Sequence, residues 1–271
     1  MARTELEVFK KALEKTKKGQ FLEAIKLYDE LIHSTTSAYS VITQDSFKIS
    51  EWEYLQDISE CEKLVNSSKA SFEGLMALSL LFKIVCNYDR RNMFLKQAIK
   101  LNSNDSRVWR EYGQTAFHLG NIRNAIQYFQ EALNLDSNDS ISLEGTGLCY
   151  YYLDEPLKAI NPLKKALSLK PENHYIMNHL AFILSELGEL DTAMEYIQKA
   201  LLLDQMNIIY LDTYACILFL QEKYDQSLVV FEKILSNKAK DWEISWDILT
   251  NLYEVLGLHV KAKQLEEKLF L

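Results

Sequence analysis

The chain contains few residues that interrupt helices, with only 8 glycines and 3 prolines in 271 positions. This scarcity argues against a turn-rich β fold and favours long, uninterrupted helices. Long apolar runs are also missing, since the longest, from Leu75 to Cys86, is broken by Lys83 and is too short to span a bilayer. We therefore expect a helical chain without membrane insertion, and its apolar content of 48% is sufficient to bury a continuous core.

Cysteines are sparse, and none of them forms a Cys-x-x-Cys pair. Cys61, Cys86, Cys149 and Cys216 are widely spaced, and three of them fall in apolar helical stretches, so we interpret them as small buried hydrophobes. This spacing favours a reducing compartment over a disulfide framework. The first five residues lack the apolar core of a signal peptide. The expected location is the cytoplasm, and the nucleus is also compatible.

The sequence also lacks the basic stripe that nucleic-acid binders normally carry. The net charge of −8 divides into −2 for residues 1–71, +1 for residues 72–173 and −7 for residues 174–271. This balance argues against DNA or RNA as the principal partner. The acidic C-terminal third is interpreted as a solvated surface, with docking of a basic partner as the alternative.

What the sequence does contain is a period of 34 residues, which is typical of a helix-turn-helix repeat. Small residues recur at this interval in two ladders, and close helix–helix approach requires small residues at such positions. Large apolar residues follow the first ladder four positions later. The first ladder is Ala125, Ala159, Ala193 and Ser227, and the second, in the preceding helix, is Gly113, Gly147, Ala181 and Ala215.

The turns between the paired helices are predicted by residues that suit a left-handed helix end. Gly120 and Gly188 lie at the end of the first helix of their units, and Asp154 and Glu222 occupy the same position as less favourable substitutes. Two helices and a tight turn therefore recur in each unit.

These ladders resemble the tetratricopeptide repeat family, whose pattern places Trp, Leu, Gly and Tyr in a first helix and Ala, Phe and Ala in a second. Residues 106–139 match best, and residues 72–105, 140–173, 174–207 and 208–241 match in part. The resemblance implies an all-α fold, a right-handed α-solenoid of about seven to eight helix-turn-helix units. The residues of the best match are Trp109, Tyr112, Gly113, Gly120, Ala125, Phe129 and Ala132.

The domain organisation follows from where this pattern is strong. We expect a weak repeat plus a degenerate helical repeat over residues 1–71, five in-phase repeats over residues 72–241, and a capping repeat over residues 242–271. Residues 39–71 form the degenerate repeat. Arg91 stands where the pattern asks for a small residue.

No constellation of catalytic or metal-binding residues emerges. The sequence has no Gly-rich phosphate loop, no His-Glu-x-x-His and no Gly-x-Ser-x-Gly. His174 and His179 are five positions apart, whereas two metal ligands on one helix prefer four. His118 is interpreted as a surface or turn residue. We expect no enzyme activity, no cofactor and no metal, and we interpret most tyrosines as core residues, namely Tyr112, Tyr128, Tyr150, Tyr196 and Tyr214.

The resemblance also implies where a partner would bind, because first helices of successive repeats line a concave groove in this family. A family clamp for C-terminal carboxylates is not matched, since only Arg110 retains a suitable charge. Tyr175 and Phe182 would supply apolar anchors, and Arg110 would fix the register. The groove residues implied by the resemblance are Arg107, Arg110, Gln114, Glu144, Tyr152, Tyr175, Asn178, His179, Phe182 and Asp212.

The predicted function is a non-enzymatic scaffold or adaptor that binds protein or peptide partners in this groove. The alternative is an assembly factor or co-chaperone that uses the same groove transiently. An RNA-binding solenoid would need a basic groove, and an enzyme would need catalytic residues in residues 39–71. Neither requirement is met by the sequence.

Overall fold

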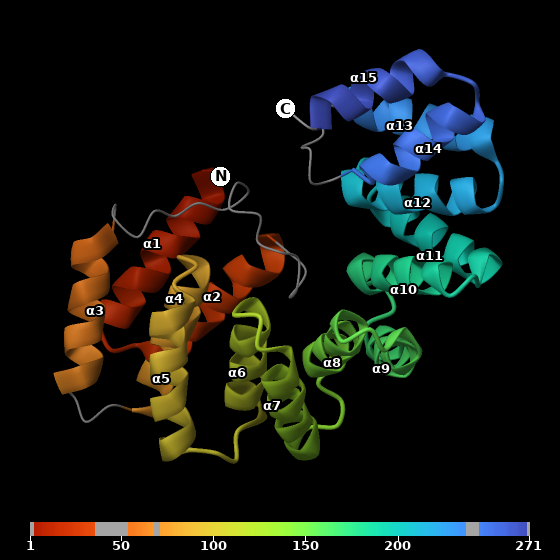
Figure 1. Cartoon of the computed structure of the whole chain (residues 1–271). Coiled ribbons are helices and arrows are strands. Elements are labelled where there is room, and N and C mark those ends of the chain that lie inside the picture. Colours follow the sequence, from red (N-terminus) through yellow and green to blue (C-terminus); the bar gives the residue numbers. More distant parts are fainter. Residues whose placement is uncertain (1–2, 36–53, 68–70, 237–243, 270–271) are drawn as a thin grey trace. The chain divides into compact units, whose positions relative to one another are not determined.

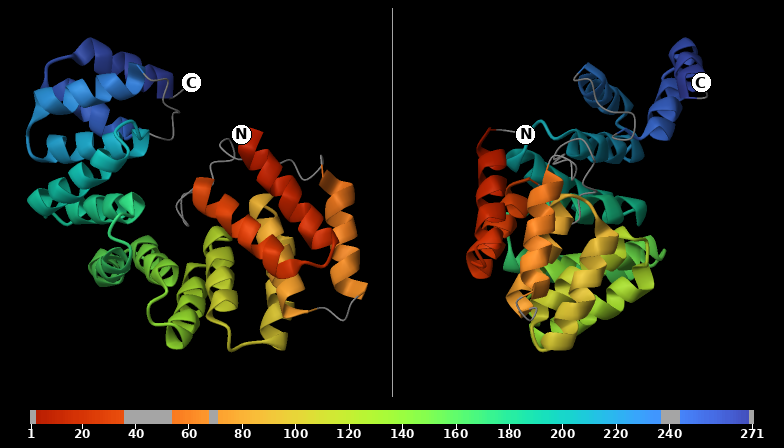
Figure 2. Two further views of the ribbon diagram at one scale, coloured as in Figure 1. Left: turned by 180° about the vertical axis from the view of Figure 1, so that it is seen from behind. Right: turned by 90° about the vertical axis from the view of Figure 1, so that its left-hand side faces the viewer.

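The computed structural model describes residues 3–35, 54–67, 71–236 and 244–269, and within these ranges the regular structure is helical (Figure 1). The chain divides into two compact units, Met1–Leu153 and Asp154–Leu271, which we call unit 1 and unit 2. In each unit, consecutive helices joined by short turns pack side by side as antiparallel pairs (Figures 1 and 2). The expected all-α helix-turn-helix architecture is therefore confirmed.

The described residues of unit 1 form three helix pairs, one intervening helix and the first helix of a further repeat. The pairs are α1 with α2, α4 with α5, and α6 with α7. The helix bounds are α1 Arg3–Lys17, α2 Phe21–Thr35, α3 Leu55–Ser67, α4 Phe72–Ile84, α5 Tyr88–Leu101, α6 Ser106–His118, α7 Ile122–Leu135 and α8 Ser140–Tyr152.

Helix α3 is what the structure describes of the segment interpreted as a degenerate repeat. Residues 39–53 and 68–70 of that segment lie outside the described residues. Helix α3 packs against α1 and α4, while α2 packs directly against α4. Ile58, Cys61 and Val65 are buried, and their spacing of three and four positions places them on one face of α3. The described part of the segment therefore contributes one helix to the core of unit 1.

Unit 2 continues the alternation with seven helices among the described residues. Pairs form between α10 and α11, α12 and α13, and α14 and α15, and α9 packs against α10. The helix bounds are α9 Pro156–Leu169, α10 His174–Glu186, α11 Leu190–Leu203, α12 Ile208–Leu220, α13 Tyr224–Ser236, α14 Trp246–Val255 and α15 His259–Leu269.

The turns inside the pairs adopt the left-handed conformation that their residues predict. The backbone φ is 74° at Gly120, 61° at Asp154, 79° at Gly188 and 61° at Glu222. Cys86 occupies the same position one repeat earlier with a φ of 56°, so this cysteine is a half-buried turn residue rather than a core hydrophobe. Each first helix thus ends at the same register, which fixes where its second helix begins.

Small residues permit the close packing within the pairs, as the ladders predict. A Cβ atom on Gly113 would lie 2.5 Å from the ring of Phe129, so α6 and α7 approach each other more closely than any larger residue allows. Ser227 is buried, and its hydroxyl donates to the Ala215 carbonyl at 2.8 Å. The predicted burial of tyrosines is wrong in degree, because Tyr112, Tyr128, Tyr150, Tyr196 and Tyr214 are only half-buried.

Candidate functional site

The predicted groove residues of unit 1 mostly make contacts within the chain. Arg107 is held by Asp105, the N-cap of α6, with Nε 2.9 Å from Oδ1 and Nη2 2.6 Å from Oδ2. The amide of Gln114 is 1% exposed and accepts from Lys83 Nζ at 2.6 Å. Glu144 is also buried, and Tyr152 is exposed by 58%. The burial of Gln114 and Glu144 depends on contacts between helices, which the repeat pattern of the sequence does not show.

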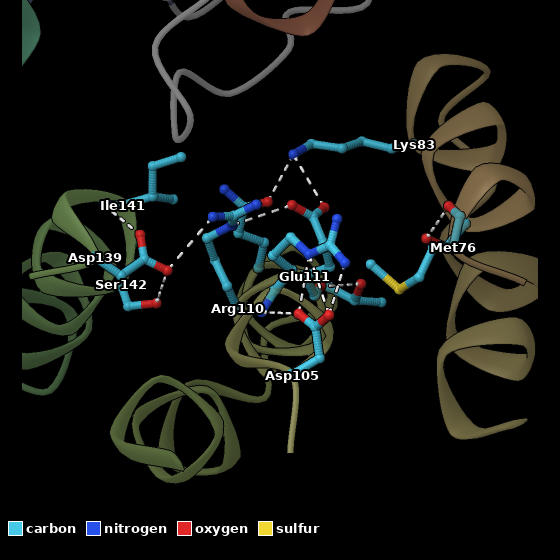
Figure 3. A network of polar contacts seen from close by, with 12 residues as sticks. Met76, Lys83, Asp105, Arg110, Glu111, Asp139, Ile141 and Ser142 are labelled. Atoms are coloured by element: carbon cyan, nitrogen blue, oxygen red, sulfur yellow. Dashed lines mark hydrogen bonds and ion pairs between the residues drawn. The ribbon is translucent and has the colours of Figure 1, made fainter. Parts of the chain in front are cut away.

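Glu111 is the centre of a buried ionic network that joins α4, α5 and α6 (Figure 3). Its Oε2 accepts from Arg91 Nη2 and lies 3.4 Å from Lys83 Nζ, and its Oε1 lies 3.4 Å from Arg110 Nε. Arg110 Nη1 then reaches Asp139 Oδ2, the N-cap of α8, at 3.5 Å. The residue that interrupts the small-residue pattern, Arg91, is therefore fully buried and ion-paired.

Burial and neighbouring charges shift the pKa values of this network. Burial would raise the pKa of Glu111, but Lys83, Arg91 and Arg110 together hold it well below its ordinary value. Burial lowers the pKa of Lys83 to about 8, against the attraction of Glu111. Burial, together with repulsion from the charge of Glu111, raises the pKa of Asp29 on α2 to about 6. The network stays largely ionised near neutral pH.

A row of aromatic rings follows the ends of α6 and α8 in unit 1. We call Tyr88, His118, Phe117, Tyr152 and Tyr151 the aromatic row. Successive ring centroids are 4.8, 6.0, 5.3 and 5.7 Å apart. The interpretation of His118 as a surface or turn residue is wrong, because it is the last residue of α6 and its ring is half-buried and stacked on Tyr88. Only Tyr152 of this row had been predicted as a site residue.

In unit 2, four predicted groove residues share one face of α10. Tyr175, Asn178, His179 and Phe182 are spaced by three, one and three positions, which is the spacing of a helical stripe. Phe182 is exposed by 37%, whereas Asn178 is exposed by 7% and no described residue donates a hydrogen bond to its Oδ1. The α10 stripe therefore combines aromatic surface with an unused acceptor.

Aromatic and histidine contacts hold the N-terminal end of this stripe. The Tyr175 ring lies 4.3 Å from the His174 ring and 6.2 Å from the Tyr210 ring, measured between centroids. His174 Nδ1 and the Tyr210 hydroxyl are 2.7 Å apart. These contacts between α10 and α12 restrict the rotamer of Tyr175, which reduces the entropy that a bound partner would have to remove.

Asp212, the remaining predicted groove residue, caps the C-terminal helix pair. Its Oδ1 accepts from the Ser245 backbone N–H at 2.8 Å and its Oδ2 from the Ser245 hydroxyl at 2.7 Å. Burial raises the pKa of Asp212, although the bonds from Ser245 lower it in part. This carboxylate positions the start of α14, so its contacts are structural.

Neither a metal centre nor a membrane span is found in the part of the chain that the structure describes. There, no three His, Cys, Asp or Glu residues are grouped as metal ligands would be, and no helix combines the length and apolar character that crossing a bilayer requires. One surface pocket of about 440 Å³ lies between α1 and α3, lined by residues that include Lys10, Lys17 and Tyr54. None of the predicted groove residues lines it.

Comparison with known proteins identifies two of the repeats directly. A family model described as tetratricopeptide repeat matches residues 106–139, and a second with the same description matches residues 174–205. The comparison with curated proteins gives no match. The two matched ranges correspond to the pairs α6–α7 and α10–α11.

Solved structures share the fold at low sequence identity. PilF of Pseudomonas aeruginosa is 16% identical with a TM-score of 0.64, over 85% of this chain and 96% of that one. A tetratricopeptide repeat protein of Parabacteroides merdae is 21% identical with a TM-score of 0.62, over 73% and 78% of the two chains. YrrB, described as a TPR protein with an unusual peptide-binding site, is 17% identical with a TM-score of 0.54, over 65% and 90%. The chain therefore contains two tetratricopeptide repeats, over residues 106–139 and 174–205, and shares the helical fold of these solved structures.

Proposed function

We propose that the chain is a non-enzymatic scaffold or adaptor that binds a segment of another protein along the first helices of its repeats. Tetratricopeptide repeats are typically non-catalytic interaction modules, and the family matches support that general role. The observation that carries the finer proposal is the α10 stripe, where an exposed phenylalanine lies on the same helix face as a half-buried tyrosine and a buried amide.

The chemistry of the stripe favours a partner segment with apolar side chains. Tyr175 and Phe182 are seven positions apart, so two turns of α10 separate the two aromatic contacts. Aromatic anchors contribute a large share of the energy of most interfaces. Phe182 is exposed by 37% and Tyr175 is half-buried, so an extended segment or a helix of the partner could place apolar side chains against them.

Two further features of the proposal come from charge. In unit 1, the side chain of Arg110 is exposed by 20% and would contribute a charge-assisted hydrogen bond to a partner bound at that unit. Residues 174–271 carry a net charge of −7, which supports a basic segment as partner of unit 2.

The test is double substitution of Tyr175 and Phe182 by alanine in the full chain. Loss of two aromatic anchors should weaken binding of a partner recovered by affinity purification by at least tenfold, because hot-spot truncations cost about 2 kcal/mol or more each. Helicity is checked by circular dichroism. Val229→Ala on α13, exposed by 67%, is the matched control for loss of exposed apolar surface and should bind as the wild type does. Unchanged affinity of the double variant would reject the α10 stripe as the binding face.

The same purification distinguishes an adaptor from a transient assembly factor. A stable complex of fixed stoichiometry that survives gel filtration supports the adaptor. Weak association with several clients supports the assembly factor instead, and recovery of nucleic acid in place of protein would contradict both.

A further inference from the structure

Positive charge is absent from the first helices of the pairs in unit 2, which are α10, α12 and α14. Asp154–Leu271 contains no arginine, and these three helices contain no lysine, whereas α9, α11, α13 and α15 all do. With histidine counted as neutral, the three first helices therefore carry negative charge alone. Their acidic residues are Glu186, Asp212, Asp247 and Glu254.

Apolar side chains of α10 and α12, which pack against each other, lie on the same face of the stack. Tyr175 and Ile209 are 34 positions apart, so they occupy equivalent places in successive repeats. Ile209, Cys216 and Leu220 share one face of α12, because they are spaced by seven and four positions. Ile209 is exposed by 42%, Leu220 by 43% and Phe182 on α10 by 37%. Exposed apolar side chains therefore border the seam between α10 and α12 on both sides.

The described residues of this seam offer little to an anionic group. The N–H groups at the start of the two helices already have acceptors, since Asn173 Oδ1 accepts from two of them on α10 and Asn207 Oδ1 from one on α12. Lys223, in the turn after α12, donates to Gln221 at 2.9 Å. A carboxylate or phosphate of a partner would therefore lose hydration here without gaining an ion pair from α10 or α12.

The spacing of the apolar side chains matches another helix better than an extended strand. Tyr175 and Phe182 are separated by about 10.5 Å along α10, and Ile209 and Leu220 by about 16.5 Å along α12. A partner helix has the same rise, so its own apolar face repeats at these intervals. Side chains on one side of a strand repeat at about 7 Å, which coincides with neither distance.

We infer that the seam between α10 and α12 binds an amphipathic helix of a partner protein, with an apolar face bordered by lysine or arginine. This inference rests on the proposed function and names the partner class for unit 2. The apolar face packs against Tyr175, Phe182, Ile209 and Leu220, and the basic residues lie near Glu186, which is exposed at the end of α10.

Selection from a phage-displayed library of random 16-residue peptides against the full chain tests the partner class. Enriched peptides should repeat apolar residues at i, i+3 or i+4 and i+7, with Lys or Arg beside them. A synthetic copy should gain helicity on binding, and amidation of its C-terminus should leave its Kd unchanged. Acidic peptides, apolar residues at every second position, loss of binding on amidation, or enrichment of no sequence would each overturn the inference.

The effect of Tyr175→Ala combined with Phe182→Ala on the selected peptides separates this inference from the proposed function. Unchanged binding would reject the α10 stripe as a binding face, and with it the proposed function. A loss of at least tenfold for peptides that are acidic or strand-like would reject the partner class alone.

A pair of variants at Leu220 isolates the charge of the seam. Leu220→Lys and Leu220→Glu remove the same apolar contact and introduce opposite charges. At low salt, the Kd of a selected basic peptide should be at least about threefold higher for Leu220→Lys than for Leu220→Glu. Val229→Lys and Val229→Glu on α13, where Val229 is exposed by 67%, are the matched pair and should bind alike. Equal Kd values for the two Leu220 variants would contradict a basic partner at this seam.

Discussion

Gly113 shows how one residue sets the distance between two helices. An added Cβ would lie 2.5 Å from Phe129, which is 0% exposed and is held by the core of unit 1. We expect Gly113→Ala to destabilise the chain by up to about 2 kcal/mol, because overpacking costs about 1–3 kcal/mol and the gain in helix propensity offsets about 1 kcal/mol of that cost. Urea unfolding measures the change.

A second substitution, at Phe129, tests whether the loss of stability comes from the clash with its ring. Phe129→Leu should restore part of the stability that Gly113→Ala removes, so the two changes should be non-additive. Additive losses would mean that Gly113 is required for a reason other than its contact with Phe129.

The same scale shows what periodicity could not reveal. The left-handed turns at Gly120 and Glu222 follow from their 34-residue spacing, but Cys86 occupies the same position without any side-chain preference for it. Arg91 is tolerated at a position where the pattern has a small residue, because Glu111, twenty positions later in the chain, compensates its charge. A sequence pattern reports local period and size, whereas an ion pair between helices depends on how the helices pack.

At the scale of helices, the sequence predicts that the residues of the α10 stripe share one face, but it does not predict the contacts that the neighbouring helices make. Tyr175, Asn178, His179 and Phe182 share a face because of the helical period, so the sequence predicts their grouping. Asp212 lies at an equivalent position of α12, but its carboxylate is used by Ser245 at the start of α14. Which members of a predicted face remain available therefore depends on caps and ion pairs formed between repeats.

The packing of α5 against α6 also creates a group that resists protonation. The pKa of His118 is lowered from 6.5 to about 3. Burial is the largest cause, the charges of Arg91 and Lys83 add to it, and the charge of Glu111 opposes it. The unfolded chain takes up a proton below pH 6.5 that the folded chain does not. His118 therefore contributes stability above pH 6.5 that is lost as the pH falls from 6.5 towards 3.

We expect His118→Phe, which keeps a ring against Tyr88, to lose less stability on acidification than the wild type. The difference in the free energy of unfolding between the two proteins should change by at most about 1.4 kcal/mol per pH unit between pH 6.5 and 4. Urea midpoints measured at intervals across this range give the result. The raised pKa of Asp29 acts in the opposite direction but cancels in the comparison. Parallel stability curves would show that His118 is not the linked group.

At the scale of the whole molecule, each unit has its own buried core. The core of unit 1 extends from Phe9 to Val108, with a smaller cluster from Ala116 to Cys149, and a core of unit 2 extends from Leu211 to Ala262. In repeat proteins, stability is approximately a sum of terms for each repeat and for its neighbours. A lesion in one unit should therefore act locally, in contrast to a single cooperative core.

Phe231→Leu tests this independence, because Phe231 is 0% exposed in the core of unit 2. Loss of buried ring contacts should cost about 1 kcal/mol. Hydrogen exchange followed by mass spectrometry should then show faster exchange in α12, α13 and α14, with unchanged exchange in α1, α2, α4 and α5. Phe94→Leu on α5 is the reciprocal variant and should give the reverse pattern. Equal acceleration throughout the chain in both variants would contradict independent units, since it would require one cooperative unfolding transition for all the repeats.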